Sequence, residues 1–444
     1  MVQDTSPSPE MYLARRPGAR CGGWGQSDPA SSGPIDYADL RERTVLWAVS
    51  VPGESPWCAL AGDTPFAHTS SQPHKFPVPG ASHVGVQIKV YNSADAFKST
   101  EIHTFVGILT SEPFNTNLEL DTPVLVPTLH VLFHHPVPPT IIPRVYPSVS
   151  YSRAIRNELI AWIAHTSLAG DLDAAEWLLL SIISRVQSRT PSILPLSLTI
   201  SRFPSPTGLS TIPTLVHALS QLVALLTTLP LSLETINNTA FAPESKDEDL
   251  HSGWLQLPKG SVCLVTEGGV TEGKVVERGM ANLRALQETM SNQRLEYVFP
   301  FSRFAFDTDV AFVVLAEGKK SAFFETDTNV PLQPQEANFD FYAKPQIVQA
   351  PPQEKLEAFR SLIGAAKVGN ITINEETAQF IQDDFVKQRQ AAPSSFEAPS
   401  SEELIRRMMV ARLLALSLQE TEITAPIWEA AKSLETRRKA RFST

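Results

Sequence analysis

The chain has 444 residues, enough for about two or three domains, and its 42% hydrophobic and 19% charged content is typical of globular proteins. A formal net charge of −10 excludes an overall basic field of the kind that drives non-specific nucleic-acid binding. Three widely separated cysteines, Cys21, Cys58 and Cys263, favour a reducing compartment and have no zinc-ligand spacing. No apolar run reaches the roughly 18 residues that a membrane helix needs, and no signal peptide is visible. We therefore predict a protein without membrane association.

Residues 1–135 predict a β-rich domain. Short runs of β-branched and aromatic residues occur at Thr44–Val51, Val84–Tyr91, Ile102–Leu109 and Leu129–Phe133. Four or five such strands with long loops fit a small barrel of the oligonucleotide-binding (OB) type. Residues 136–150 hold five prolines, which is the composition of a semi-rigid linker. Because Met1–Asp4 reads like the interior of a strand, we expect the true N-terminus to lie further upstream.

Residues 151–350 predict an α/β domain, and residues 351–444 a helical region. Helices are expected from Ser152 and from about Asp173, followed by strands and helices in alternation. The expected strands are Leu196–Ser201, Leu231–Ile236, Gly260–Thr266 and Val310–Ala316, and the expected helices are Thr211–Thr228 and Val275–Asn292. This alternation predicts a parallel sheet covered on both faces, within an α+β multidomain chain. The last region predicts helices at Gln353–Ala366, Asn374–Gln390, Ser401–Leu418 and Ala425–Arg441.

The segment 168–180 has the outline of a phosphate-binding loop. Such a loop reads G-x-x-x-x-G-K-[ST], with backbone N–H groups around the phosphates and a lysine that reaches the outer ones. Gly170 and the following Asp171 begin the motif, but Ala175 stands at the second glycine, Glu176 at the lysine and Trp177 at the hydroxyl residue. A carboxylate repels a triphosphate and an indole does not ligate magnesium. We therefore expect a strand-to-helix turn that holds no nucleotide or other cofactor; the alternative is an ordinary Gly-Asp turn before a helix.

The apolar run 260–265 ends in Thr266 and Glu267, where many ATPases have an Asp-Glu pair that binds magnesium and activates water. Threonine is a poor magnesium ligand, so hydrolysis is not expected. The alternative is an ordinary buried strand with a polar exit. Glu317, after the run Val310–Ala316, stands where a nucleotide-sensing amide is expected, and an ionised carboxylate donates no hydrogen bond. Lys319 and Lys320 then read as a solvated turn.

Histidines and arginines offer weaker signals. His130 and His134 lie at the end of an expected strand, beside His135, and would share a face of it. Because no cysteine or carboxylate is near enough in the sequence to complete a tetrahedral set, we predict no metal there.

The helix 401–418 is amphipathic and fits a core position better than a partner-binding one. The basic end, Lys432 and 437–441, fits a nuclear-import signal, a nucleic-acid patch or a solvated helix end.

Several segments together resemble one family. They are 1–12, 40–57, 168–183, 253–258 (GWLQLP), 383–386 (DDFV), 410–417 (VARLLALS) and the arginine-rich end. In order and over nearly the whole chain, the set resembles the mini-chromosome maintenance (MCM) complex-binding protein family, in a form similar to its fungal members.

The resemblance implies a nuclear, diverged relative of the MCM ring helicase with an AAA+-like domain. Because Glu176, Trp177 and Thr266 depart from the helicase motifs, we expect that domain to be degenerate and the protein to be a non-enzymatic binding factor. It implies binding to MCM subunits, roles in ring assembly, in protecting new subunits and in unloading rings from chromatin, and an indirect association with chromatin. It implies no small-molecule substrate.

Two other hypotheses stay open. One is a weak ATPase with a composite site, to which Arg406, Arg407 or Arg412 would contribute in trans. The other is a single-strand nucleic-acid module in the N-terminal domain that uses Lys75, Lys89 and Lys98, which are sparse for that role.

Overall fold

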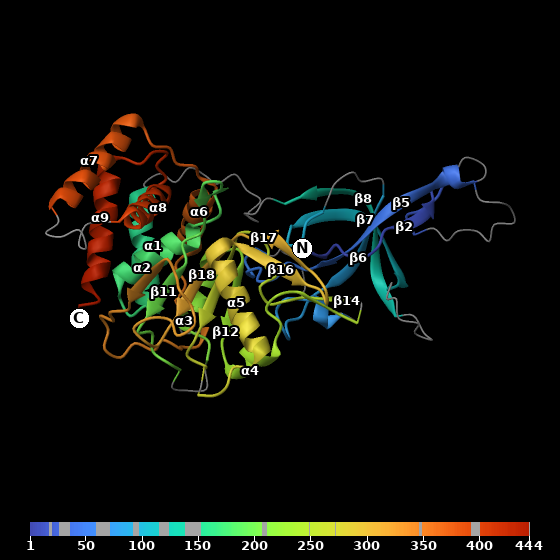
Figure 1. The fold of residues 1–444 in the computed structure, drawn as a ribbon, viewed down its shortest axis with the longest axis horizontal. Coiled ribbons are helices and arrows are strands. Elements are labelled where there is room, and N and C mark those ends of the chain that lie inside the picture. Colours follow the sequence, from blue (N-terminus) through green and yellow to red (C-terminus); the bar gives the residue numbers. More distant parts are fainter. Residues whose placement is uncertain are drawn as a thin grey trace.

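A computed structural model describes most of the chain as a mixture of helices and sheets, with a β-rich part at one end and the helices gathered at the other (Figure 1). The described residues are 1–16, 20–25, 36–58, 72–91, 97–114, 124–137, 152–206, 211–247, 249–270, 272–345, 349–391 and 400–443. Within these ranges no helix has the length and apolar character needed to span a bilayer. Most of the predicted linker, 138–150, lies outside the described residues.

The N-terminal part is built on a mixed sheet with the strand order β1-β5-β6-β8-β7, and β2 also pairs with β5. These strands are β1 (Val2–Asp4), β2 (Glu10–Leu13), β5 (Leu40–Val49), β6 (Gly85–Tyr91), β7 (His103–Pro113) and β8 (Leu125–Pro136). The β6–β8 pair is parallel and the other pairs are antiparallel. All four strands predicted in this region are confirmed. Short elements complete it: β3 (Arg15–Arg16), β4 (Arg20–Cys21), and the 3-10 turns η1 (Tyr37–Asp39) and η2 (Pro73–Lys75).

The predicted parallel sheet is confirmed, with the strand order β12-β15-β18-β11-β19. Its strands are β11 (Leu198–Ser201), β12 (Leu226–Pro230), β15 (Ser261–Thr266), β18 (Val310–Leu315) and β19 (Thr328–Pro331). Every residue of β15 and β18 is buried, because interior parallel strands are covered on both faces. Val262 and Leu264 point to one core, and Cys263 and Val265 point to the other.

Helices cover both faces of this sheet. The helices α1 (Ser152–Ser167), α2 (Leu172–Ile183) and α3 (Thr214–Leu222) contribute to the first core. The helices α4 (Leu233–Asn238) and α5 (Glu277–Asn292) contribute to the second. The helix α2 is almost wholly buried, since it is packed between the sheet and the C-terminal helices.

The C-terminal helices extend the first core. They are α6 (Gln353–Val368), α7 (Glu375–Ala391), α8 (Ser401–Ser417) and α9 (Ala425–Ala440), and all four were predicted to within a few residues. Leu362 of α6, Val410 of α8 and Trp428 of α9 are buried in the same apolar cluster as Leu198 of the sheet. The α/β layer and these helices therefore fold around a shared core, and the α8 stripe is a core face, as predicted.

Two predictions next to α3 are wrong. The predicted helix to Thr228 ends at Leu222, and Leu226–Pro230 form the edge strand β12. The predicted strand Leu231–Ile236 is instead the helix α4. Ser232 is its N-cap and accepts a hydrogen bond from the Thr235 N–H at 3.0 Å, which starts the helix at Leu233, three residues after the end of β12.

A small sheet that the sequence did not reveal lies between the two parts of the molecule. Its order is β14-β13-β16-β17, with β13 (Glu244–Lys246), β14 (Asp249–His251), β16 (Arg294–Val298) and β17 (Arg303–Asp307). The hairpin β9 (Ser188–Arg189) and β10 (Ser192–Ile193) follows α2. Gln256 donates a hydrogen bond to the Gln3 carbonyl at 2.6 Å, so polar contacts join this region to β1.

Candidate functional site

The predicted phosphate loop lies between two helices. Gly170 follows α1 and precedes α2, so the expectation of a strand-to-helix turn is wrong. Gly170 has a φ of +81° and donates its N–H to the Ala164 carbonyl at 2.9 Å, which is a glycine-type end for α1. Local spacing reproduced the motif, but a phosphate-binding loop follows a strand.

Asp171 is fully engaged inside the protein. It is the N-cap of α2 and accepts from the Ala174 N–H at 3.0 Å. Its two oxygens also accept from both terminal nitrogens of Arg441, at 2.7 and 2.8 Å, and from the Gln333 N–H at 2.8 Å. Asp171 is 1% exposed and Arg441 is 7% exposed, so this is a buried, bidentate ion pair.

The remaining positions of the motif are also used for packing. Glu176 pairs with Arg156 at 2.5 Å and with Arg437 at 3.3 Å. Ala175 and Trp177 are completely buried, and the Arg438 guanidinium lies 5.8 Å from the Trp177 ring. The acidic loop therefore holds the C-terminal helix α9 against α2, which explains why this motif carries carboxylates.

Glu267 follows β15 at the carboxyl edge of the parallel sheet and is buried, as is Thr266. The Glu267 carboxylate accepts from the Ser321 hydroxyl and, at 3.0 Å, from the Ala322 N–H. Burial raises the pKa of this carboxyl above its usual value, and these hydrogen bonds offset the shift only in part. Glu267 thus fixes the turn after β18 by hydrogen bonds. The neighbouring residues 317–320 form an exposed turn, as their composition predicted.

The strand order gives a second segment in which to look for the phosphate-loop motif. The first strand of the parallel sheet is β11, and the strand–loop–helix unit that such loops need is β11, residues 202–213 and α3. Aligned on Gly208, this connection has Phe203 at the first glycine, Leu209 at the lysine and Ser210 at the hydroxyl position. Residues 207–210 lie outside the described ranges. The lysine is therefore absent from both candidate segments, and recognising the second one required the strand order.

The basic C-terminal end is neutralised by ion pairs within the chain. Each of its cations contacts a carboxylate, in the pairs Lys432–Asp384 (3.0 Å), Arg437–Asp173 (2.9 Å), Arg438–Glu435 (2.7 Å), Lys439–Glu403 and Arg441–Asp171 (2.7 Å). The Arg437 and Lys439 side chains are still 45% and 55% exposed, so this helix end is partly solvated as well as paired. Arg437 and Arg441 connect the end of α9 to the start of α2, whereas Arg438 pairs within α9.

The side chains named for the two alternative functions are mostly engaged elsewhere. Arg407 is buried, donates to Gln388 at 2.9 Å and lies over the Trp428 ring; Arg412 donates to Gln187 at 2.8 Å. Arg406 is half-buried. In the N-terminal part, Lys75 and Lys89 are buried in ion pairs with Asp4 and Glu112, so they are not placed to contact a nucleic-acid backbone, whereas Lys98 is exposed.

The expected face shared by His130 and His134 does not form. A β-bulge in the β7–β8 pair, where Val106 pairs with Phe133 and Gly107 with Val131, adds one residue to β8 and reverses the faces beyond it. His130 contacts Tyr91 at 2.6 Å and Glu112 at 2.6 Å, whereas His134 packs against Phe97. Glu112 is also a nearby carboxylate that the sequence did not reveal, but both ring nitrogens of His130 are already engaged.

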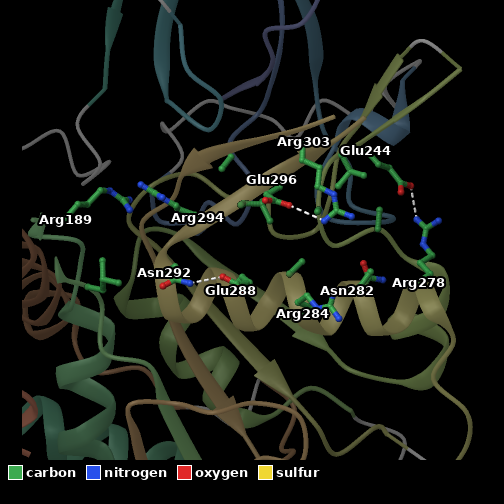
Figure 2. A pocket seen from close by; sticks show the side chains of 18 of the residues that line it. Arg189, Glu244, Arg278, Asn282, Arg284, Glu288, Asn292, Arg294, Glu296 and Arg303 are labelled. Carbon is green, nitrogen blue, oxygen red and sulfur yellow. Dashed lines mark hydrogen bonds and ion pairs between the residues drawn. The ribbon is translucent and has the colours of Figure 1, made fainter. Parts of the chain in front are cut away.

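A cavity of about 880 Å³ lies between α5 and the small sheet (Figure 2). Its charged lining is Arg189, Arg278, Arg284, Arg294, Arg303, Glu244, Glu288 and Glu296. Ion pairs cross or flank it, including Arg278–Glu244 at 2.8 Å and Arg303–Glu296 at 3.3 Å (Figure 2). This lining of arginines and glutamates resembles neither a phosphate loop nor an apolar ligand pocket.

These features define a mixed α/β protein in which the carboxylates of the degenerate phosphate-loop outline and of the β15 end contact groups of the same chain. A family model described as mini-chromosome maintenance replisome factor matches residues 59–442, and the chain belongs to this family. Mini-chromosome maintenance complex-binding proteins are among its relatives. The one from Salmo salar is 30% identical over 82% of this chain, the one from Homo sapiens 28% over 83%, and the one from Arabidopsis thaliana 26% over 86%. The chain spans 64%, 63% and 67% of these relatives' lengths, respectively.

Proposed function

We propose that this protein is a non-enzymatic binding factor for subunits of the MCM replicative helicase. The observation that carries the proposal is membership of the replisome-factor family over residues 59–442, together with relatives named for binding the MCM complex. In this proposal the protein acts in the nucleus during DNA replication, in assembly or disassembly of the MCM ring or in its unloading from chromatin. Its association with chromatin is then indirect, through the subunits that it binds.

The state of the carboxylates supports a binding role without turnover. The Asp171 and Glu176 carboxylates face arginines of the same chain, and Glu267 accepts hydrogen bonds from the turn that follows β18. A carboxylate that activates water must be within hydrogen-bond reach of that water. Binding of a partner that does not depend on a triphosphate is consistent with this arrangement.

The strand order supports an origin from a nucleotide-binding domain. In open α/β sheets, ligands bind at the carboxyl ends of the strands. The site lies between two neighbouring strands whose connections lead to opposite sides of the sheet. In this sheet the chain leaves β11 for the far edge strand β12, returns through β15 and β18, and ends at β19 on the other side of β11. We infer a diverged AAA+-like domain whose phosphate loop was the connection after β11, and an OB-like N-terminal domain upstream of it.

Retention of purified subunits by the full chain tests the binding role. The tagged protein is immobilised and offered individual MCM subunits, with ATP and magnesium or with apyrase and EDTA. We expect at least one subunit to be retained equally in both conditions, because the partner surface does not include a nucleotide. If no subunit is retained, or if retention requires ATP, the proposal is wrong.

A turnover assay tests the non-enzymatic part, with Glu267→Gln as the matched variant. Phosphate release is measured for the wild type and the variant, alone and with the retained subunit. Both proteins are expected to give the rate of the buffer or of the subunit alone. Phosphate release that appears with the wild type and disappears with Glu267→Gln would overturn the proposal.

A further inference from the structure

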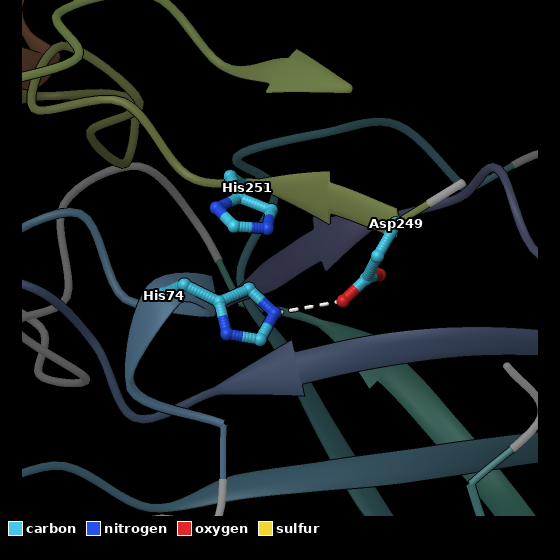
Figure 3. A group of neighbouring side chains, drawn as sticks. All are labelled: His74, Asp249 and His251. Carbon is cyan, nitrogen blue, oxygen red and sulfur yellow. Dashed lines mark hydrogen bonds and ion pairs between the residues drawn. The ribbon is translucent and has the colours of Figure 1, made fainter. Parts of the chain in front are cut away.

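Three potential metal ligands meet where the N-terminal part contacts the small sheet (Figure 3). His74 belongs to η2, and Asp249 and His251 belong to β14. Each residue offers one ligand atom, and these three atoms all lie within 4.8 Å of one another. On β14, positions 249 and 251 are two residues apart and so project to the same side of the strand.

The carboxylate is oriented by contacts outside the cluster. The Asp249 Oδ1 atom lies 2.5 Å from the Lys75 ammonium and accepts from the Leu250 N–H at 2.9 Å. These contacts direct Oδ2 toward the His74 Nε2 atom, which is 2.7 Å away. Partners of this kind fix the orientation of a ligand before an ion arrives and raise its affinity.

The backbone also holds the two elements together. The Ser252 N–H donates to the His74 carbonyl at 2.8 Å, and the Lys75 ammonium donates to the Leu250 carbonyl at 3.2 Å. The His74 and His251 rings are neighbours, with centroids 4.2 Å apart and ring planes tilted by 31° to one another. Hydrogen bonds to the backbone of both segments therefore hold the three short side chains close together.

The donor set determines which ion fits. Two imidazole nitrogens and one carboxylate oxygen suit Zn²⁺, whereas Ca²⁺ and Mg²⁺ prefer oxygen ligands throughout. All three residues are half-buried, which leaves a path for the ion and room for water as a fourth ligand. The Lys75 ammonium also pairs with the Asp4 carboxylate at 3.0 Å. Its single positive charge is therefore divided between two carboxylates and offsets only part of the negative charge on Asp249.

We propose that His74, Asp249 and His251 bind one Zn²⁺ ion, completed by a water molecule, and that the ion fastens η2 to β14. In a tetrahedral site two such ligand atoms are roughly 3.3 Å apart, so the Nε2–Oδ2 contact opens by a few tenths of an ångström as the ion enters. The proton that Nε2 shares with Asp249 leaves on binding. The ion links the N-terminal part to the α/β part of the molecule.

Zinc titration of the full chain tests the site. The protein is stripped with EDTA, desalted, freed of any histidine tag and titrated with ZnCl₂ against a chromophoric chelator. His251→Phe keeps a ring against His74 but removes the nitrogen ligand, and His74→Gln keeps a donor for Asp249. His165→Gln is the matched control, since His165 is exposed and pairs with Glu336 outside the cluster.

We expect one Zn²⁺ per chain in the wild type and in His165→Gln, and an affinity at least about 100-fold lower in the two cluster variants, because loss of even an outer partner costs 10–100-fold. Co²⁺ in the wild type is expected to give the visible spectrum of a tetrahedral nitrogen and oxygen site, which requires no variant to fold. Zinc is also expected to slow amide exchange in 72–76 and 249–252. The proposal is overturned if the stripped wild type takes up no zinc or gives no tetrahedral Co²⁺ spectrum, or if folded cluster variants bind zinc as the control does.

Discussion

The α1–α2 turn and the end of β15 both bury a carboxylate, but the protein stabilises the two by different means. Asp171 meets the Arg441 guanidinium, which lies 270 residues away along the chain. Glu267 meets a hydroxyl and an amide, which are neutral donors about 54 residues away. The first carboxylate therefore ties a terminal helix to the body by charge, whereas the second orders a local turn. The comparison shows that acidic residues at motif-like positions make structural contacts of two kinds, one with a charged partner and one with neutral donors.

Removing the charge pair should have the largest effect on stability. Asp171→Ala removes the α2 cap and leaves the buried Arg441 without its bidentate partner, so we expect the free energy of unfolding to fall by about 3–5 kcal/mol. Urea unfolding followed by circular dichroism measures the change. Asp173→Ala is the control, because Asp173 lies two residues further along, pairs with the half-exposed Arg437 at 2.9 Å and adds only a longer contact of 3.2 Å to Arg441, whose bidentate pair with Asp171 is kept. Equal losses in the two variants would show that burial of the pair is not decisive.

Removing the neutral contacts should have an intermediate effect. Glu267→Ala leaves the Ser321 hydroxyl and the Ala322 N–H without their acceptor, and we expect a loss of about 1–3 kcal/mol. The same unfolding measurement applies, with Glu317→Ala in the exposed turn as the control. A loss as large as that of Asp171→Ala would end the distinction between the two carboxylates.

The pH dependence of stability sharpens the comparison further. Because burial raises the Glu267 pKa above the ordinary value of 4.5 for a glutamate, the folded state holds this proton more tightly than the unfolded state. The Glu267 contribution is therefore fully present below pH 4.5 and is lost as the pH rises through the raised folded-state value. As the pH rises through this range, the free energy of unfolding should fall less for Glu267→Gln than for the wild type. Identical pH profiles for the two proteins would contradict the assignment.

Removing Arg437, the half-exposed arginine that pairs with Asp173 and Glu176, should have the smallest effect on stability. Arg437 is 45% exposed at its side chain, and Arg437→Ala should cost only about 0.2–1 kcal/mol. We expect this difference to shrink further as salt is raised toward about 1 M, because screening acts on exposed charges. A cost that salt does not change would place Arg437 among the buried contacts.

Local sequence patterns predicted the elements that are buried to the same extent along their whole length. The strands β15 and β18 read directly from their continuous apolar runs, since interior parallel strands are covered on both sides. The edge strand β12 was taken for the end of a helix, because an edge position leaves a mixed pattern of buried and half-buried residues. The short helix α4 was missed because six residues carry too little periodicity to separate a helix from a strand.

Contacts between distant segments explain the other errors. The phosphate-loop outline at 170–177 was placed after a strand because neither the strand order nor the arginine partners of α9 are visible in local spacing. The opposed faces of His130 and His134 depend on one bulge residue, which pairing with β7 creates. His74 and Asp249 are 175 residues apart, so no motif could have joined them.

The sequence by itself determined the α+β character, the buried strands, the C-terminal helices and the family, because these follow from composition, periodicity and ordered similarity along the chain. Only the tertiary structure decided which carboxylates meet arginines and which histidines lie together. Charge pairing and coordination depend on distances in space of a few ångströms, and folding sets those distances between residues that the chain keeps far apart.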